Sequence, residues 1–151
     1  MKIWSSYVFV GNYMTKKLIR RLIKLYDDIE SDRPYSKTKV VCFAIYHNKV
    51  LSFGVNSEKT SQYQYQMRRR ASVNDDDFTY DKTHAEIAAI KKIHPSVNWH
   101  HIELLVVSKF KNGNFRYSRP CPICEKAINS LGIKNIYYTN EGGGITKEFF
   151  I

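Results

Sequence analysis

The sequence predicts an α/β domain in which helices pack onto one β-sheet. An amphipathic helical pattern lies near the N-terminus, and five runs rich in β-branched and aromatic residues follow it. Two further helical patterns separate some of these runs, so the predicted order is α-β-β-α-β-α-β-β. Because 151 residues can bury a core of their own, we expect residues 1–151 to form a single domain, with residues 1–14 as an N-terminal extension.

The composition limits the class of protein. The chain holds 24 Lys and Arg against 14 Asp and Glu, a net charge of +10. It has no long apolar run and no signal-peptide pattern, which argues against a membrane-spanning or secreted protein. Three cysteines cannot all pair within the chain, so we expect a protein of the reducing cytoplasm. The charge favours an anionic partner, although a solvated basic surface has the same composition.

The first predicted helix covers residues 15–30, with Thr15 as its N-cap. A step of about 100° per residue separates an apolar side from a cationic side. The apolar side contains Leu18, Ile19, Leu22, Ile23, Leu25, Tyr26 and Ile29. The cationic side contains Lys16, Lys17, Arg20, Arg21 and Lys24. This pattern predicts a helix that docks on the core and exposes a basic face.

A β-hairpin is predicted next, because the run "KVVCFAIYH" is followed by the turn residues "HNK" and by "VLSFGVN". Cys42 lies among apolar neighbours in the first strand, where a free cysteine serves as a small hydrophobic residue. The polar segment 57–82 has the composition of a loop, with room for a short helix. It is followed by the helical pattern "THAEIAAIKK", residues 83–92.

The remaining elements are a strand over His101–Phe110, a helix closed by Gly132, and two short strands. In the last two strands, about six residues, "TNEGGG", separate "IYY" from "ITKEFF". A parallel crossover needs about a dozen residues or more. The last two strands are therefore predicted to pair antiparallel.

Two helix starts carry residues suited to metal binding. Cys121 and Cys124 have the spacing C-x-x-C, which places both sulfurs on one face of a first helical turn. His84 begins the other helix and can join them if the two helices lie side by side on the sheet. Three ligands leave the fourth zinc position open for water, and Glu86 can then serve as a proton shuttle.

A closed zinc knuckle is the alternative. It would take His94, His100 or His101 as a fourth ligand, and it leaves the His84 and Glu86 pair without a purpose.

The two motifs are H-x-E at His84-Ala85-Glu86 and P-C-x-x-C at residues 120–124. With these motifs the chain resembles the zinc-dependent cytidine/deoxycytidylate deaminase superfamily over most of its length. The resemblance implies a three-layer α/β/α sandwich with a five-stranded mixed sheet. It also implies one Zn²⁺ held by His84, Cys121 and Cys124, and Glu86 as the general acid and base that helps convert cytosine to uracil.

The resemblance extends to the substrate contacts. An antiparallel final pair of strands resembles the branch with free-cytidine, phage deoxycytidylate-type and some toxin deaminases. The segment "GVNSE" resembles the N-x-E segment that holds the ribose hydroxyls, which assigns Asn56 and Glu58 to the sugar. Ala85, between the two motif residues, is also assigned to the substrate. The alternative for Asn56 is a structural cap at the strand end.

Three functions remain open. The first is deamination of a free cytidine or deoxycytidine nucleoside or monophosphate, in which Arg68, Arg69 or Arg70 would meet a phosphate. The second is deamination of cytosine in single-stranded DNA or RNA, with the basic helix along the backbone and Tyr63 and Tyr65 as stacking platforms. The third is a zinc-stabilised nucleic-acid-binding module without catalysis. The resemblance also makes a homo-oligomer one expected state of assembly.

Overall fold

The computed structural model describes residues 14–32, 38–59, 62–70 and 82–150. Apart from Met14, the expected N-terminal extension lies outside the described residues. The helices are α1 (Lys16–Asp28), α2 (Gln62–Arg70), α3 (Ala85–Ile90) and α4 (Pro122–Leu131). The strands are β1 (Val40–Tyr46), β2 (Lys49–Val55), β3 (Ile102–Ser108), β4 (Asn135–Thr139) and β5 (Ile145–Phe149).

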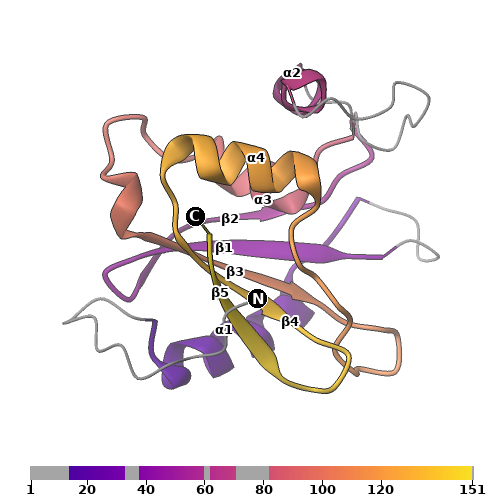
Figure 1. Ribbon diagram of the computed structural model, residues 1–151. Coiled ribbons are helices and arrows are strands. Elements are labelled where there is room, and N and C mark those ends of the chain that lie inside the picture. The colour runs from indigo at the N-terminus through magenta and orange to yellow at the C-terminus, as the bar shows by residue number, and fades with distance from the viewer. Residues whose placement is uncertain (1–13, 33–37, 60–61, 71–81, 151) are drawn as a thin grey trace.

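The five strands form one mixed sheet in the order β2-β1-β3-β4-β5. Strands β3 and β4 run parallel, joined through α4, and the other neighbouring pairs run antiparallel. Helix α1 covers one face of the sheet, whereas α3 and α4 cover the other (Figure 1). The predicted three-layer α/β/α sandwich and the antiparallel final pair of strands are therefore confirmed.

Alternation along the strands divides the core into two halves, because successive side chains of a strand point to opposite faces. The half beneath α1 includes Leu22, Tyr26, Val41, Phe43, Ile45, Leu105, Val107 and Tyr137. The half beneath α3 and α4 includes Cys42, Ala44, Ala89, Ile90, Leu104, Val106, Ile128, Ile136 and Tyr138. Every residue of β3 is buried. The prediction that Cys42 serves as a small core residue is confirmed, since it is fully buried.

The β1–β2 hairpin turns through His47 and Asn48, whose φ angles are +49° and +61°. Two successive residues with positive φ match the twist of a two-residue hairpin loop. The side chain of Asn48 also accepts a hydrogen bond from the backbone N–H of Thr15, at 2.9 Å. The turn of the hairpin therefore lies at the end of the sheet where α1 begins.

Gly54 sets the distance between β2 and α3. A Cβ at this position would lie 2.3 Å from the backbone nitrogen of Ala89 and 2.5 Å from the carbonyl oxygen of Ala85. These are backbone atoms, so they cannot move aside as a flexible side chain could. Glycine lets the strand and the helix touch, and this contact fixes the height of α3 above the sheet.

Three sequence predictions need correction. The sequence places Leu25 on the apolar side of the first helix, yet this side chain is 41% exposed. The buried residues of α1 are Leu22 and Tyr26, so the fully buried face of the helix is narrower than its apolar face. The third strand is shorter than His101–Phe110, because residues 99–101 form a 3₁₀ turn before it. The helix predicted over residues 83–92 is regular only over Ala85–Ile90. The loop 57–82 does contain a helix, α2.

Candidate metal centre and its cavity

The three predicted ligands lie at the starts of two neighbouring helices. His84 is the N-cap residue of α3 and Cys121 is the N-cap residue of α4, both with extended backbone dihedrals. Cys124 follows in the first turn of α4 and is fully buried. Pro122 occupies the first position of α4. A backbone N–H there would have no partner within the helix, so proline loses no helical hydrogen bond at this position. The N-terminal ends of both helices thus bring the three side chains together.

The distances fit a tetrahedral zinc site. The Nδ1 atom of His84 lies 3.3 Å from the sulfur of Cys121 and 3.4 Å from the sulfur of Cys124. Ideal Zn–S and Zn–N bonds of a tetrahedral centre place such atoms about 3.5 Å apart. All three ligand atoms lie within 4.8 Å of one another, and among the described residues this is the one His, Cys, Asp and Glu group that does so. The chain therefore fits one Zn²⁺, with Nδ1 as the histidine ligand.

The fourth ligand of a zinc knuckle has no counterpart here. His94 contacts Ser96 in an exposed loop, and His100 lies against Gly132. His101 packs against the rings of Tyr46 and His47. These contacts place the three candidate histidines away from the two cysteines, so within the described part of the chain the centre has three protein ligands.

Glu86 lies beside the ligands in the first turn of α3, with only 4% of its surface exposed. Burial raises the pKa of this carboxyl group above its ordinary value, while the neighbouring His84 acts in the opposite direction. A glutamate whose pKa is raised toward neutrality can both accept and return a proton. Its position and its electrostatics are those expected of a proton carrier.

The two cysteines differ in how readily they release a proton. The pKa of Cys121 is lowered to about 4, first because Cys124 donates a hydrogen bond to its thiolate and further because His84 lies close. The pKa of Cys124 is instead raised well above its ordinary value, first by that hydrogen bond and then by burial. The start of a helix also favours negative charge, through the dipole and the unpaired N–H groups. Cys121 is therefore ready to bind a metal as a thiolate, whereas Cys124 has to release its proton on binding.

A cavity of about 210 Å³ opens against this group. Its lining consists of Val40, Asn56, His84, Ala85, Glu86, Arg116, Tyr117, Ser118, Arg119 and Cys121. Ala85, Glu86, Asn56 and Ser118 are buried, while Tyr117 is 52% exposed. The cavity therefore has a closed inner end beside the ligands and an open end at Tyr117.

The predicted sugar contacts occupy different positions. Asn56 lines the cavity, but its side chain also holds the start of β1: Oδ1 accepts from the Val40 N–H at 2.8 Å, and Nδ2 donates to the Thr38 carbonyl at 2.9 Å. A primary amide has a second N–H and a second lone pair, so these bonds do not exhaust it. Glu58 is not part of the lining and forms an ion pair with Lys82 at 2.6 Å.

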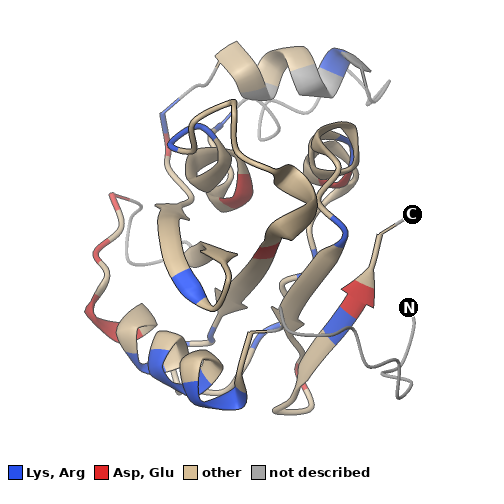
Figure 2. Cartoon of the chain, turned by 90° about the vertical axis from the view of Figure 1, so that its left-hand side faces the viewer, with Lys and Arg blue, Asp and Glu red and all other residues tan. Residues whose placement is uncertain are grey.

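The basic groups singled out in the sequence lie elsewhere. The cationic residues of the first helix lie on α1, on the opposite side of the sheet from α3 and α4 (Figure 2). Tyr63 of α2 packs against the cluster of Ile87, Ile123, Cys124 and Ala127. Tyr65 has the exposed Arg69 over its ring, and the side chains of Arg68 and Arg70 lie outside the described residues. None of the described members of this set lines the cavity.

Sequence reasoning missed one wall of the cavity, residues 116–119. Ser118 fixes this segment to the sheet, because its hydroxyl donates to the Val106 carbonyl at 2.8 Å and its N–H bonds the Thr139 carbonyl. Arg119 pairs with both oxygens of Glu148 on β5 and with Glu125 on α4. The stretch "RYSRPC" runs directly into Cys121, and this adjacency was the available signal.

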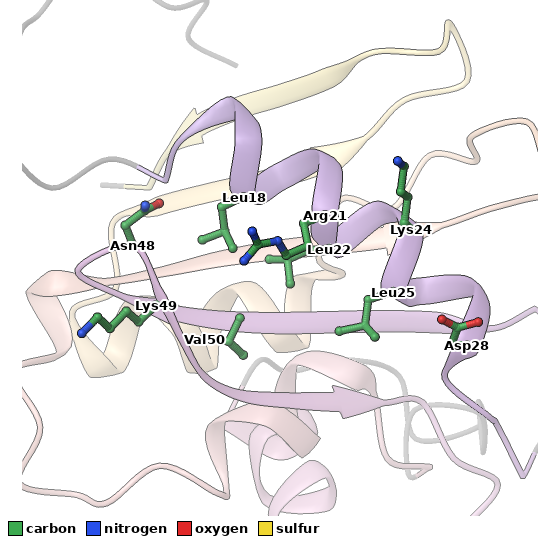
Figure 3. Close-up of a pocket in the computed structure, with 9 residues that line it drawn as sticks. All are labelled: Leu18, Arg21, Leu22, Lys24, Leu25, Asp28, Asn48, Lys49 and Val50. Atoms are coloured by element: carbon green, nitrogen blue, oxygen red, sulfur yellow. The ribbon is translucent and has the colours of Figure 1, made fainter.

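A second and larger hollow, about 550 Å³, lies between α1 and β2. Figure 3 shows apolar side chains of α1 facing Val50, with Arg21, Lys24 and Lys49 at the rim. It lies on the α1 side of the sheet and contains no member of the metal group. Size alone therefore does not mark the reactive site of this protein.

Fold and site together define a class: a three-layer α/β/α protein with a His-Cys-Cys zinc centre and a buried glutamate at two helix starts. The sequence profile described as "Cytidine and deoxycytidylate deaminase zinc-binding region" matches residues 14–140. The chain belongs to this family of zinc-binding deaminases.

Two solved structures share the fold of this chain. Cytidine deaminase from Burkholderia pseudomallei superposes with a TM-score of 0.59 at 19% identity, covering 90% of this chain and 93% of that one. The dCMP deaminase of cyanophage S-TIM5 superposes with a TM-score of 0.50 at 21% identity, covering 84% of this chain and 86% of that one. A search of curated protein sequences returns no match. Among the described residues no helix is long and apolar enough to cross a membrane.

Proposed function

We propose that this protein hydrolyses the exocyclic amino group of cytosine, giving uracil and ammonia, in a free cytidine or deoxycytidine nucleoside or its monophosphate. The observation that carries the proposal is the closed end of the small cavity. There a buried carboxyl group, Glu86, lies beside a three-ligand zinc set, in a chain of the cytidine and deoxycytidylate deaminase family. The two solved relatives are named for activity on cytidine and on dCMP.

The metal ligands and Glu86 have different roles in the proposed reaction. Zinc bound by His84, Cys121 and Cys124 supplies Lewis acidity, which makes a water nucleophilic near neutral pH. Glu86 takes a proton from the attacking water and passes it to the ring nitrogen next to the amino-bearing carbon. It then delivers the second proton to the departing amine, so that water and cytosine become uracil and ammonia. The burial that raises the pKa of Glu86 suits both transfers.

Two further lining residues are proposed to orient the base and sugar. We propose that Asn56 and the backbone at Ala85 contact the sugar and the ring, because both line the inner part of the cavity. The volume of about 210 Å³ lies below the range of about 300–1,000 Å³ typical of drug-sized ligands. A single pyrimidine ring with part of its sugar suits this space. Glu58 remains a predicted sugar contact that would have to leave Lys82 to act.

The experiment is a substrate panel with zinc-loaded protein. Cytidine, deoxycytidine, CMP, dCMP and cytosine-containing single-stranded oligonucleotides are incubated separately, and uracil products and ammonia are both measured. Turnover of at least one monomer is expected. Turnover of oligonucleotides alone would replace this proposal by the polynucleotide alternative. Stoichiometric zinc without ammonia from any compound would leave the binding module instead.

A further inference from the structure

One cation at the open end of the cavity has no part in the chemistry described above. Two guanidinium groups line the cavity, those of Arg116 and Arg119. Arg119 is held by Glu148, at 2.7 and 3.0 Å, and by Glu125 at 2.7 Å. Among the described residues no carboxylate pairs with Arg116, which is only partly buried. Within the described part of the chain, the cavity therefore presents one positive charge that no carboxylate neutralises.

The backbone of Arg116 is held on both sides. Its N–H donates to the Ser108 carbonyl at the end of β3, at 2.9 Å. Its carbonyl accepts from the hydroxyl of Thr139 at the end of β4, at 2.7 Å. Because the backbone is fixed to two strand ends, ligand binding has to order only the Arg116 side chain and not the loop, which favours affinity. This is the arrangement of a prepared binding residue.

The charge balance of the lining defines the ligand. Among the described residues that line the cavity, Glu86 is the one carboxylate, and it is buried. A cytosine base and its sugar are neutral, so an unneutralised guanidinium at the other end offers a nucleoside no ionic contact. A phosphate ester on the same sugar is an anion, and the planar guanidinium of arginine can bind two of its oxygens through two N–H groups.

We infer that Arg116 binds a phosphate ester carried by the cytosine sugar, so that the substrate is a nucleotide rather than a nucleoside. This inference rests on the proposed deamination and narrows its substrate class. The phosphate has two sources, a free monophosphate and the phosphodiester of a single strand. The test separates them.

The test compares wild-type protein with Arg116→Gln and Arg116→Lys. For each protein, kcat/KM is measured with cytidine, deoxycytidine, CMP, dCMP and a short cytosine oligonucleotide. A hydrogen-bonded contact to a charged group corresponds to about a tenfold to hundredfold effect. Wild type is expected to prefer the phosphorylated compounds, and Arg116→Gln is expected to lower their kcat/KM by that factor while changing nucleoside turnover less than about threefold. Arg116→Lys should fall between the two.

The control is Arg20→Gln, which removes a cation from the exposed face of α1 and should leave every ratio unchanged. Equal turnover of nucleosides and nucleotides by wild type, or equal losses for both in Arg116→Gln, overturns the inference. Activity confined to oligonucleotides identifies the phosphodiester as the source, and comparable rates on monophosphates identify the free nucleotide.

A binding measurement keeps the two proposals separable. Calorimetry with the zinc-loaded protein compares CMP and dCMP with cytidine and deoxycytidine, in wild type and in Arg116→Gln. If no compound is deaminated, the proposed function fails. The phosphate inference then stands only if the nucleotides bind at least tenfold more tightly and lose that advantage in Arg116→Gln. It fails if nucleotide and nucleoside bind alike.

Discussion

Helix α1 begins at Thr15, whose hydroxyl accepts a hydrogen bond from the Leu18 N–H at 3.1 Å. Helices α3 and α4 begin at His84 and Cys121, and neither side chain makes a capping hydrogen bond. A Ser, Thr, Asp or Asn cap stabilises a helix by about 1 kcal/mol relative to residues that cannot cap. The N-cap residue of α1 therefore stabilises its helix, whereas the N-cap residues of α3 and α4 are metal-ligand candidates that do not cap.

This difference explains where the site can be. An N-cap residue has extended backbone dihedrals, so its side chain projects beyond the helix toward the neighbouring helix start. His84 and Cys121 both use that position, and their sulfur and nitrogen atoms come within 3.3 Å. Unpaired N–H groups at the same ends favour the thiolate. Helices α3 and α4 thus lack the stabilisation of a capping side chain, and in its place each N-cap position holds a metal-ligand candidate. The variants below test this relation between stability and metal binding.

The largest effect is expected from Glu86→Gln. Loss of the proton carrier should lower kcat about 10²- to 10⁴-fold, because the amide can neither accept nor return the proton. The zinc content should stay at that of wild type, since Glu86 is not a ligand in the proposed site. Steady-state kinetics and metal analysis measure both. Glu141→Gln, at an exposed position in the β4–β5 turn, is the matched control. Wild-type rates in Glu86→Gln would remove Glu86 from the mechanism.

Cys121→Ser exchanges the ligand for a capping residue. Zinc and activity should both be lost, because the hydroxyl is a poor zinc ligand compared with a thiolate. Without metal, however, the serine hydroxyl can cap α4, so the free energy of unfolding should be equal to that of metal-free wild type or higher by about 1 kcal/mol. Urea unfolding in the presence of a chelator gives this comparison. A metal-free variant that unfolds more easily than metal-free wild type would contradict the exchange of stability for chemistry.

Glu148→Gln tests how the loop before Cys121 is held. Hydrogen bonds from Arg119 lower the pKa of Glu148, so the charged form is favoured in the folded protein. Its contribution is present above the unfolded glutamate pKa of about 4.3 and is lost as the pH falls through the lower folded value. At pH 7 the variant should lose about 1.5–3 kcal/mol, as for a hydrogen bond to a charged group.

Unfolding in urea at several pH values measures that loss. The gap between wild type and Glu148→Gln should close as the pH falls below the ordinary glutamate range, because wild type then loses the same charge. Glutamine still offers an oxygen to the Tyr138 hydroxyl, which donates to Glu148 at 2.9 Å. A gap that stays constant down to acid pH would show that the charge of Glu148 is not what holds Arg119.

The smallest effect is expected from Thr15→Ala. Removing the cap of α1 should lower the free energy of unfolding by about 1 kcal/mol. Thr15→Ser, which keeps the hydroxyl, should change little. Both variants should keep wild-type zinc content and kcat, since Thr15 lies at the hairpin-turn end of the sheet and lines no part of the cavity. A change in activity without a change in stability would contradict the separation of the two kinds of helix start.

Much of this architecture follows from sequence patterns whose physical cause is local. The periodicity of residues 15–30, the turn residues His47 and Asn48, and the short "TNEGGG" link each specify one element or one pairing. The metal group was also predictable, because Cys121 and Cys124 are close in the chain and His84 begins the other helix. The spacing of residues close in the sequence predicts each half of the metal group. The fold then places the starts of α3 and α4 side by side on the sheet.

Other features depend on contacts between distant residues. Arg119 forms an ion pair with Glu148 of β5, which is distant in the sequence, and no local pattern indicates that pairing. Asn56 resembles a sugar contact in sequence, yet its amide also holds the backbone at Thr38 and Val40, which only the fold reveals. Leu25 fits the apolar period of α1 but lines the open hollow between α1 and β2, so it stays 41% exposed. Packing and pairing between distant parts of the chain decide these cases.

The contact at Gly54 has a consequence for protein engineering. Since β2 touches the backbone of α3 there, the hairpin sets the height of the histidine-bearing helix above the sheet. Anyone transplanting this centre into another scaffold would need the strand with its glycine as well as the two helix starts. A graft of the motif residues alone would set the histidine too high above the sheet to meet the two sulfurs.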